Sequence, residues 1–117
     1  MSRVRLVFSG SGGQGVITAA IILAEAAVIY EGMNATQSQS YGAAARGGVT
    51  RSDVIIDNQE IDFPEVIQPN VVVCLTQEAY NNYSNIIRPG GILLTDSKYV
   101  QTIKKVDAKK LELPIYD

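Results

Sequence analysis

The 117-residue chain contains no histidine and a single cysteine, Cys74. Without histidine, catalysis by a Ser-His or Cys-His pair and metal binding through imidazole are excluded within the chain. One cysteine can form neither an internal disulfide nor a four-thiolate iron–sulfur site. We therefore expect no metal site among the candidate sites of this chain. This cysteine content is also compatible with the reducing cytoplasm, where we expect the protein to reside.

The sequence also lacks a strong excess of basic charge and a long hydrophobic run. Ten basic and twelve acidic residues give a formal net charge of -2, whereas proteins that bind nucleic acid usually carry a basic field. The apolar region at 16–30 is interrupted by Thr18 and Glu25, and it is shorter than the roughly 20 residues that span a bilayer. No signal peptide is visible, because glycines follow directly after the first short apolar run. We expect neither a nucleic-acid nor a membrane partner.

The residues that are present form the pattern of one α/β domain, for which this length is sufficient. In chain order the pattern predicts a strand at 4–8, a helix at 14–30, an extended segment at 34–40, strands at 49–57 and 71–75, a helix at 77–87 and a strand at 92–95. Continuous apolar runs such as 71–75 are typical of central parallel strands covered on both faces. We predict a three-layer α/β/α sandwich with a mostly parallel, Rossmann-like sheet, in which 4–8, 71–75 and 92–95 are neighbouring strands.

The helix predicted at 14–30 is apolar nearly all round, because Val16, Leu23 and Ile29 add to an apolar face that includes Ile17 and Ala20. A helix of this kind is usually buried on more than one side.

The C-terminal tail alternates weakly and is rich in lysine. Because these lysines are interleaved with Asp107 and Glu112, we interpret the tail as a solvated stretch. Residues 111–117 read like the start of another segment, with no closing helix to cover the sheet. We expect residues 1–117 to be a single domain truncated at its C-terminus.

A glycine-rich turn lies between the first predicted strand and the first helix. Gly10, Gly12 and Gly15 match the G-x-G-x-x-G spacing of dinucleotide-binding folds, in which the helix N-terminus holds an anion. That reading also needs a carboxylate about twenty positions later to hold a ribose. Residues 34–40 contain none, and Glu31 lies too early. The alternatives are another anionic ligand, tight strand–helix packing or a subunit contact.

A second glycine-rich loop, at 42–48, presents Arg46 between residues with almost no side chain. A ligand or partner backbone could therefore approach its guanidinium closely. Arg46 and Arg51 together could grip a carboxylate or phosphate, and the alternative is a solvated loop with two surface arginines. Other donors and acceptors lie nearby in the sequence, at Gln37, Gln39 and Tyr41. None of these groups is a plausible general base.

Four further residues are given structural roles. Cys74 lies within an apolar strand and is expected to act as a small hydrophobic core residue. Asp96 follows a strand, where an aspartate most often caps a turn. Tyr80 and Tyr83 lie three positions apart on a predicted helix, and we expect them to be partly buried packing residues and not a stacking platform.

The two glycine motifs together, in this order and spacing, resemble the gamma subunits of 2-oxoacid:ferredoxin oxidoreductases. The resemblance covers nearly the whole chain, and the matching segments are 10–15, 26–32, 36–42, 46–48, 51–52, 71–75 and 90–93. The stretch at 27–51 is most similar to the members of the family that act on 2-oxoglutarate. Gamma parts in the family are longer than this chain.

The resemblance implies an enzyme that converts a 2-oxoacid, coenzyme A and oxidised ferredoxin to an acyl-CoA, carbon dioxide and reduced ferredoxin. It places thiamine diphosphate with Mg in alpha and beta partner subunits, and iron–sulfur clusters in a ferredoxin-like delta subunit. This chain would then contribute no catalytic residue, bind no cofactor by itself and be inactive alone. The alternatives are a free-standing Rossmann-like nucleotide-binding module and a non-catalytic interaction module.

The two glycine loops are predicted to share one surface, because loops after parallel strands gather at one edge of a sheet. This requires residues 34–40 to be a parallel neighbour of the first strand. The surface would contact a partner subunit or the phosphates of coenzyme A. Its candidate residues are Gly10, Gly12, Gly13, Gln14, Gly15, Arg46, Gly47, Gly48 and Arg51.

Overall fold

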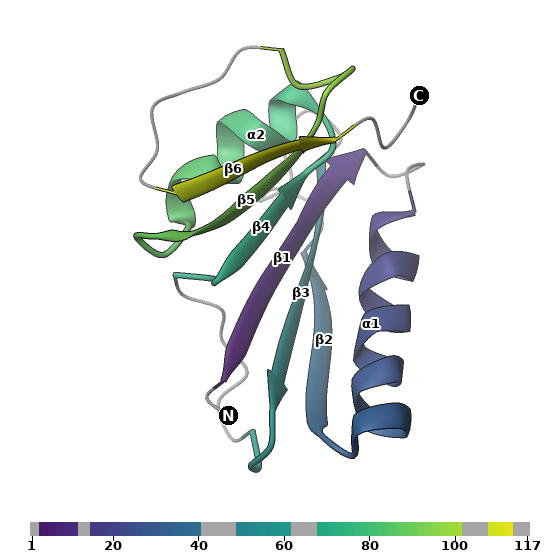
Figure 1. The fold of residues 1–117 in the computed structure, drawn as a ribbon. Coiled ribbons are helices and arrows are strands. Elements are labelled where there is room, and N and C mark those ends of the chain that lie inside the picture. The colour runs from purple at the N-terminus through teal and green to yellow at the C-terminus, as the bar shows by residue number, and fades with distance from the viewer. Residues whose placement is uncertain (1–2, 12–14, 41–48, 62–67, 102–107, 114–117) are drawn as a thin grey trace.

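The computed structural model describes residues 3–11, 15–40, 49–61, 68–101 and 108–113. These residues form one six-stranded sheet in the order β2-β3-β1-β4-β5-β6 (Figure 1). The strands are β1 (Val4–Ser11), β2 (Asn34–Ser40), β3 (Val49–Asp57), β4 (Val71–Cys74), β5 (Gly91–Asp96) and β6 (Ala108–Leu113). The helices are α1 (Val16–Glu31), α2 (Gln77–Tyr83) and the short 3-10 helix η4 (Ser84–Ile86).

The sheet is mostly parallel, as predicted. β1 pairs with β4, β4 with β5 and β5 with β6, all in parallel, so the three strands expected to be neighbours are neighbours. β3 runs antiparallel to both β1 and β2. Consequently β2 runs in the same direction as β1 but is separated from it by β3, which corrects the expectation that it might be a direct neighbour.

Strand β6 was not predicted, because its residues were interpreted as a solvated stretch. Its sequence, AKKLEL, is almost entirely exposed, so it lacks the apolar run by which the inner strands are recognised. Lysines on an outer strand are a common way of protecting a sheet edge from further pairing.

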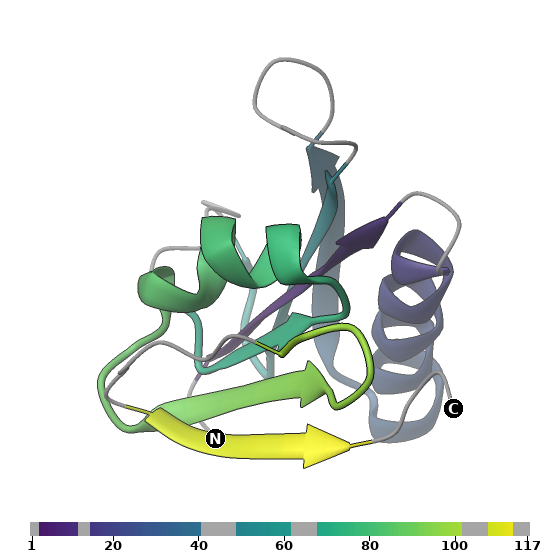
Figure 2. The same cartoon turned by 90° about the horizontal axis from the view of Figure 1, so that it is seen from above.

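The two helices cover opposite faces of the sheet, which gives the three predicted layers (Figure 2). Successive residues of β4 alternate between the two sides. Val72 and Cys74 join a core with Tyr80 of α2, whereas Val73 packs with Val16 of α1.

Helix α2 begins where the sequence predicted. The Thr76 hydroxyl accepts a hydrogen bond of 3.1 Å from the backbone N–H of Ala79, which is the expected N-cap arrangement. Tyr80 is fully buried and Tyr83 nearly so, so their predicted packing role is confirmed.

Helix α1 is buried on one side only within the described chain. Val16, Ala20 and Ala27 are its buried residues, whereas Ile22 and Ile29 are 61% and 68% exposed. The expectation of burial on several sides is therefore wrong for the described residues. The stripe of α1 that is buried against the sheet consists of Val16, Ala20 and Ala27, whereas the large side chains of Ile21, Ile22, Val28, Ile29 and Tyr30 are exposed.

Cys74 and Asp96 have the structural roles expected of them. Cys74 is fully buried, and burial raises the pKa of its thiol to about 11, although a hydrogen bond from Ser9 acts in the opposite direction. One carboxylate oxygen of Asp96 accepts hydrogen bonds from the backbone N–H groups of Lys98 and Tyr99, so this residue caps the turn after β5.

Two properties of the described residues bear on function. None of their helices has the length and apolarity needed to cross a membrane. They also contain no group of three or more Cys, Asp or Glu side chains arranged to hold a metal ion.

Candidate ligand and partner edge of the sheet

The two glycine-rich loops are attached to the sheet at neighbouring positions. Ser11, the last residue of β1, pairs with Val49, the first residue of β3. Ser40, the last residue of β2, pairs with Arg51. Both loops therefore leave the sheet at the same end of its strands, and we call this end the candidate edge. Their central residues, Gly12, Gly13, Gln14, Tyr41, Arg46, Gly47 and Gly48, lie outside the described residues, so the shared surface stays a prediction.

The described glycines of the first loop have different surroundings. Gly10 is buried within β1, opposite Thr50 of β3. Gly15 is the N-cap of α1 and has a left-handed backbone with φ 75°. A Cβ at Gly15 would meet no atom within 4 Å, so the backbone conformation, and not crowding, favours glycine there.

The N-terminus of α1 is not neutralised by its own sequence. No side chain caps it, and its first turn contains no acidic residue. The positive end of the helix dipole is thus directed toward the edge where both loops depart, and such an end favours a negatively charged group.

Arg51 lies at this edge, but a carboxylate of its own strand already holds its side chain. Its Nε and one terminal nitrogen donate to the two carboxylate oxygens of Asp53, at 2.7 and 3.1 Å. The guanidinium carbon also lies 5.2 Å from the ring centre of Tyr83 on α2. Arg51 therefore projects from the face opposite α1. The predicted joint grip with Arg46 would require Arg51 to leave these contacts.

A polar cluster lies on the face of the sheet that α1 covers, and the sequence predicted only part of it. The side-chain amide of Gln37 donates to Gln39 at 2.9 Å and to the hydroxyl of Ser52 at 2.7 Å. Ser52 is fully buried and donates weakly to the carbonyl of Ser38. Gln37 and Gln39 were expected in this neighbourhood, but Ser52 was missed. The signal was its position next to Arg51, which places it on the other face of the strand.

The titratable groups with shifted pKa values are structural. The pKa of Asp57 lies below its usual value mainly because Arg3 donates to its carboxylate at 3.0 Å. Cys74 is held as a neutral, buried thiol. The described residues of the edge thus offer means of binding an anion or a partner, but they do not include an activated nucleophile or a general base.

Similarity to known proteins identifies the family. The family described as pyruvate ferredoxin/flavodoxin oxidoreductase matches residues 5–116. The chain belongs to this family. The sequence-based recognition of a 2-oxoacid:ferredoxin oxidoreductase gamma-type chain is confirmed.

Individual members of the family are similar over almost the whole chain. The 2-oxoglutarate synthase subunit KorC of Methanocaldococcus jannaschii is 46% identical over 96% of this chain and 61% of its own length. The gamma subunit of a keto/oxoacid ferredoxin oxidoreductase from Geobacter sulfurreducens PCA is 42% identical, with a TM-score of 0.86 over 97% of this chain and 61% of its own. The chain thus spans about three-fifths of the length of these relatives.

A more distant structure shares the fold. The 2-oxoglutarate:ferredoxin oxidoreductase from Magnetococcus marinus, solved with 2-oxoglutarate, coenzyme A and succinyl-CoA bound, superimposes with a TM-score of 0.75 at 19% identity. The match covers 92% of this chain and 19% of that one. At this identity the similarity concerns the architecture alone.

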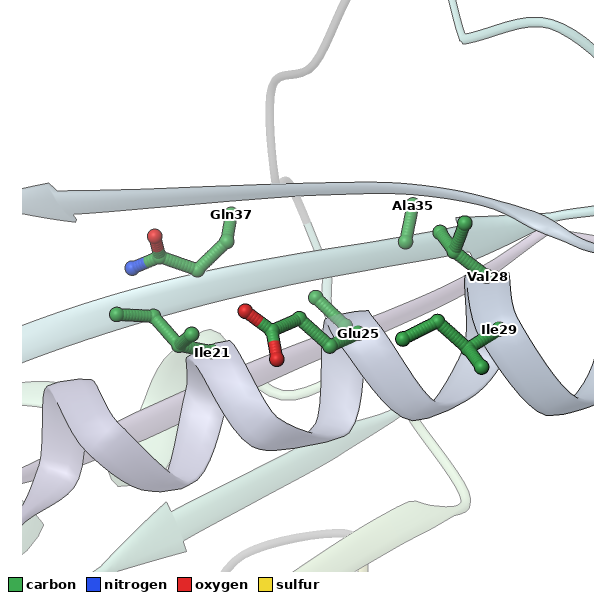
Figure 3. A pocket seen from close by; sticks show the side chains of 7 residues that line it. Ile21, Glu25, Val28, Ile29, Ala35 and Gln37 are labelled. Carbon is green, nitrogen blue, oxygen red and sulfur yellow. The ribbon is translucent and has the colours of Figure 1, made fainter.

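A second surface feature lies on the flank of the sheet. A groove of about 570 Å³ runs between α1 and the outer strand β2. We call it the α1–β2 groove, and it is lined by Ile21, Ala24, Glu25, Val28, Ile29, Ala35 and Gln37. Figure 3 shows Gln37 opposite Ile21 and Glu25, with Ala35 near Val28. Sequence reasoning did not identify this groove, since it had assigned α1 to the interior.

Proposed function

We propose that the chain is the gamma-type part of a 2-oxoacid:ferredoxin oxidoreductase whose 2-oxoacid is 2-oxoglutarate. The complete enzyme would convert the 2-oxoacid and coenzyme A to an acyl-CoA and carbon dioxide, and would pass the electrons to ferredoxin. The observation that carries this proposal is the similarity, over almost the whole chain, to a 2-oxoglutarate synthase subunit.

Within that enzyme the chain has a positioning role. It contains no histidine, and its one cysteine is a buried thiol. In line with the family resemblance, we assign thiamine diphosphate with Mg to alpha and beta subunits and the iron–sulfur clusters to a ferredoxin-like delta subunit, and the absence of histidine and of a cysteine cluster here agrees with that division. The assembled enzyme would act in the cytoplasm, and this chain alone would be inactive.

The edge that carries both glycine loops is the proposed contact with a partner subunit or with the phosphates of coenzyme A. Two observations support this choice. The loops depart from paired strand positions, and the uncapped N-terminus of α1 lies beside Gly15. The proposed contacts are Gly10, Gly12, Gly13, Gln14, Gly15, Arg46, Gly47 and Gly48, with Arg51 included only if it leaves Asp53.

The proposal is tested by purifying the tagged protein from its native source. We expect thiamine-enzyme subunits to co-purify, together with ferredoxin-reducing activity that depends on coenzyme A and is higher with 2-oxoglutarate than with pyruvate or 2-ketoisovalerate. Activity that prefers pyruvate would overturn the substrate assignment. A lone chain that binds NAD would replace the whole proposal with the nucleotide-binding alternative.

A further inference from the structure

Helix α1 carries large apolar side chains on its outward face as well as on the face that contacts the sheet, where Val16 is buried. An ordinary surface helix turns its large apolar residues to the core and its polar residues to solvent. In α1 the small residues Ala20 and Ala27 are buried against the sheet, whereas Ile22 and Ile29 are 61% and 68% exposed. No contact within the described chain explains why isoleucine occupies these outward positions.

The outward residues form a continuous seam. Thr18, Ile22, Glu25 and Ile29 follow one another at spacings of four, three and four positions, which places them in one row along the helix. The same alternation of three and four characterises the contact seam between two packed helices. We call these four residues the α1 seam.

The α1–β2 groove lies directly beside the seam and shares Glu25 and Ile29 with it. Its further apolar members Ile21 and Val28 are 37% and 49% exposed. Figure 3 shows these side chains together along the helix, facing β2. Seam and groove thus make one contiguous, mainly apolar surface that contains the charged Glu25, and exposed apolar surfaces of this kind commonly mark protein interfaces.

Glu25 is the one charged residue of the seam, and it defines the partner's chemistry. It is exposed and makes no ion pair with the described residues. Helix α1 contains no basic residue. If two copies packed α1 against α1 about a two-fold axis, Glu25 near the middle of the seam would approach its own equivalent. Like charges in such a contact are unfavourable, so the seam does not suit a second copy.

We propose that the α1 seam and the α1–β2 groove dock an apolar helix of a different polypeptide, which places a lysine or arginine opposite Glu25. The inference rests on the proposed function in one respect, namely that the chain works inside a heteromeric enzyme. The docking surface lies along α1 and β2, whereas the glycine loops lie at the end of the strands.

Photo-crosslinking in the intact complex tests the surface. A photo-reactive amino acid is placed at Ile22 in the tagged native protein, and at Asn82 as the control, since Asn82 is exposed on α2 in the opposite layer. We expect irradiation to link position 22, but not position 82, to an apolar helix of another subunit with a basic residue nearby. A link from position 22 to a second copy of this chain, or to another part of the same polypeptide, would overturn the inference.

Substitutions then test the energetics. Ile22→Asp with Ile29→Asp is expected to reduce partner retention by about tenfold or more, as for central interface residues. The matched control, Asn82→Asp, should change retention by less than about twofold, as for substitutions outside the interface. Glu25→Lys should also weaken retention, and replacing the cross-linked basic residue of the partner with glutamate should restore it. Equal melting midpoints of the purified variants establish that they are folded.

Failure of this inference is distinguishable from failure of the proposed function. An active heteromeric oxidoreductase that gives no cross-link from position 22, and that tolerates both aspartates, overturns the docking surface alone. A chain that purifies with no oxidoreductase subunit and no activity overturns both.

Discussion

Arg51 and Asp53, two positions apart on β3, join side chain to side chain through two hydrogen bonds of 2.7 and 3.1 Å. Residues at this spacing lie on the same face of a strand, so β3 itself aligns the pair. Both side chains are largely buried, at 18% and 16% exposure, and Tyr83 lies beneath the guanidinium. The arginine beside the second glycine loop is therefore part of the domain's packing.

Arg51→Ala is expected to lower the free energy of unfolding by about 1–3 kcal/mol, because it leaves a partly buried carboxylate without its hydrogen-bond partner. Urea unfolding of the purified chain measures the loss. The control is Arg88→Ala, since Arg88 is exposed and its replacement should change stability by no more than about 0.5 kcal/mol. Unchanged stability in Arg51→Ala, with a raised coenzyme A requirement in the complex, would show that Arg51 is a ligand residue instead.

Arg46→Ala, in contrast to Arg51→Ala, should affect binding and leave the stability of the chain nearly unchanged. We expect weaker subunit assembly or a higher apparent coenzyme A requirement, with thermal stability retained within about 1 kcal/mol, because the loop residue is expected to be exposed. Enzyme titration with coenzyme A and calorimetry of the same preparation measure the two quantities. A large loss of stability with unchanged assembly would assign Arg46 to a structural pair like that of Arg51.

The Arg3–Asp57 pair predicts a pH dependence. Hydrogen bonding by Arg3, assisted by the backbone N–H of Gln59, lowers the pKa of Asp57 in the folded chain below its ordinary value of 3.8. The folded state therefore gains stability from the ionised carboxylate above the unfolded pKa. That gain is lost as the pH falls through the folded pKa.

Urea unfolding at several pH values between neutrality and about 2.5, a range set by ordinary carboxylate pKa values, should show this dependence. We expect Asp57→Asn to be less stable than the parent chain at neutral pH, with the difference shrinking at the acidic end. Glu60→Gln, at an exposed position of the same turn, serves as the control and should show little difference throughout. A difference for Asp57→Asn that did not depend on pH would mean that the carboxylate charge is not the stabilising feature.

Cys74 should not react with alkylating agents in the folded protein. Its thiol is fully buried, and its pKa of about 11 keeps it protonated at pH 8, while alkylation requires the thiolate. Because the folded pKa exceeds the unfolded one, the stability associated with the neutral thiol persists at neutral pH and declines above about pH 9, the unfolded value. Iodoacetamide labelling followed by mass spectrometry should modify Cys74 only in denaturant. Rapid labelling of the native chain would contradict its placement.

The inner half of the sheet could be predicted because its strands carry their own signal. The apolar runs of β4 and β5 and the turn chemistry around Thr76 are local properties, and both appear in the structure as expected. The residues of β3 do not by themselves reveal its direction, since alternation is the same in a parallel and an antiparallel strand, and the signal lay instead in the connection that precedes it. The connection from β2 to β3, through residues 41–48, is shorter than the crossover that a parallel neighbour requires, and the two strands pair antiparallel.

The candidate edge was predictable in outline but not in its contacts. Loop order placed both glycine motifs at one end of the parallel strands, and the described flanks agree with this. The commitment of Arg51 to Asp53 depends on side-chain geometry, which spacing alone does not reveal. The outward face of α1 was missed for a different reason. An apolar helix face has the same composition whether its own sheet or another polypeptide covers it.

The first residues of β3 are held from both sides, by Ser11 of β1 at Val49 and by Ser40 of β2 at Arg51. The anchor points of the two loops therefore cannot separate unless backbone hydrogen bonds of a central ladder break. A ligand that moved one anchor would have to move the other with it. The two loops thus share one strand as their anchor, and a displacement of the first residues of β3 would reach both attachment points.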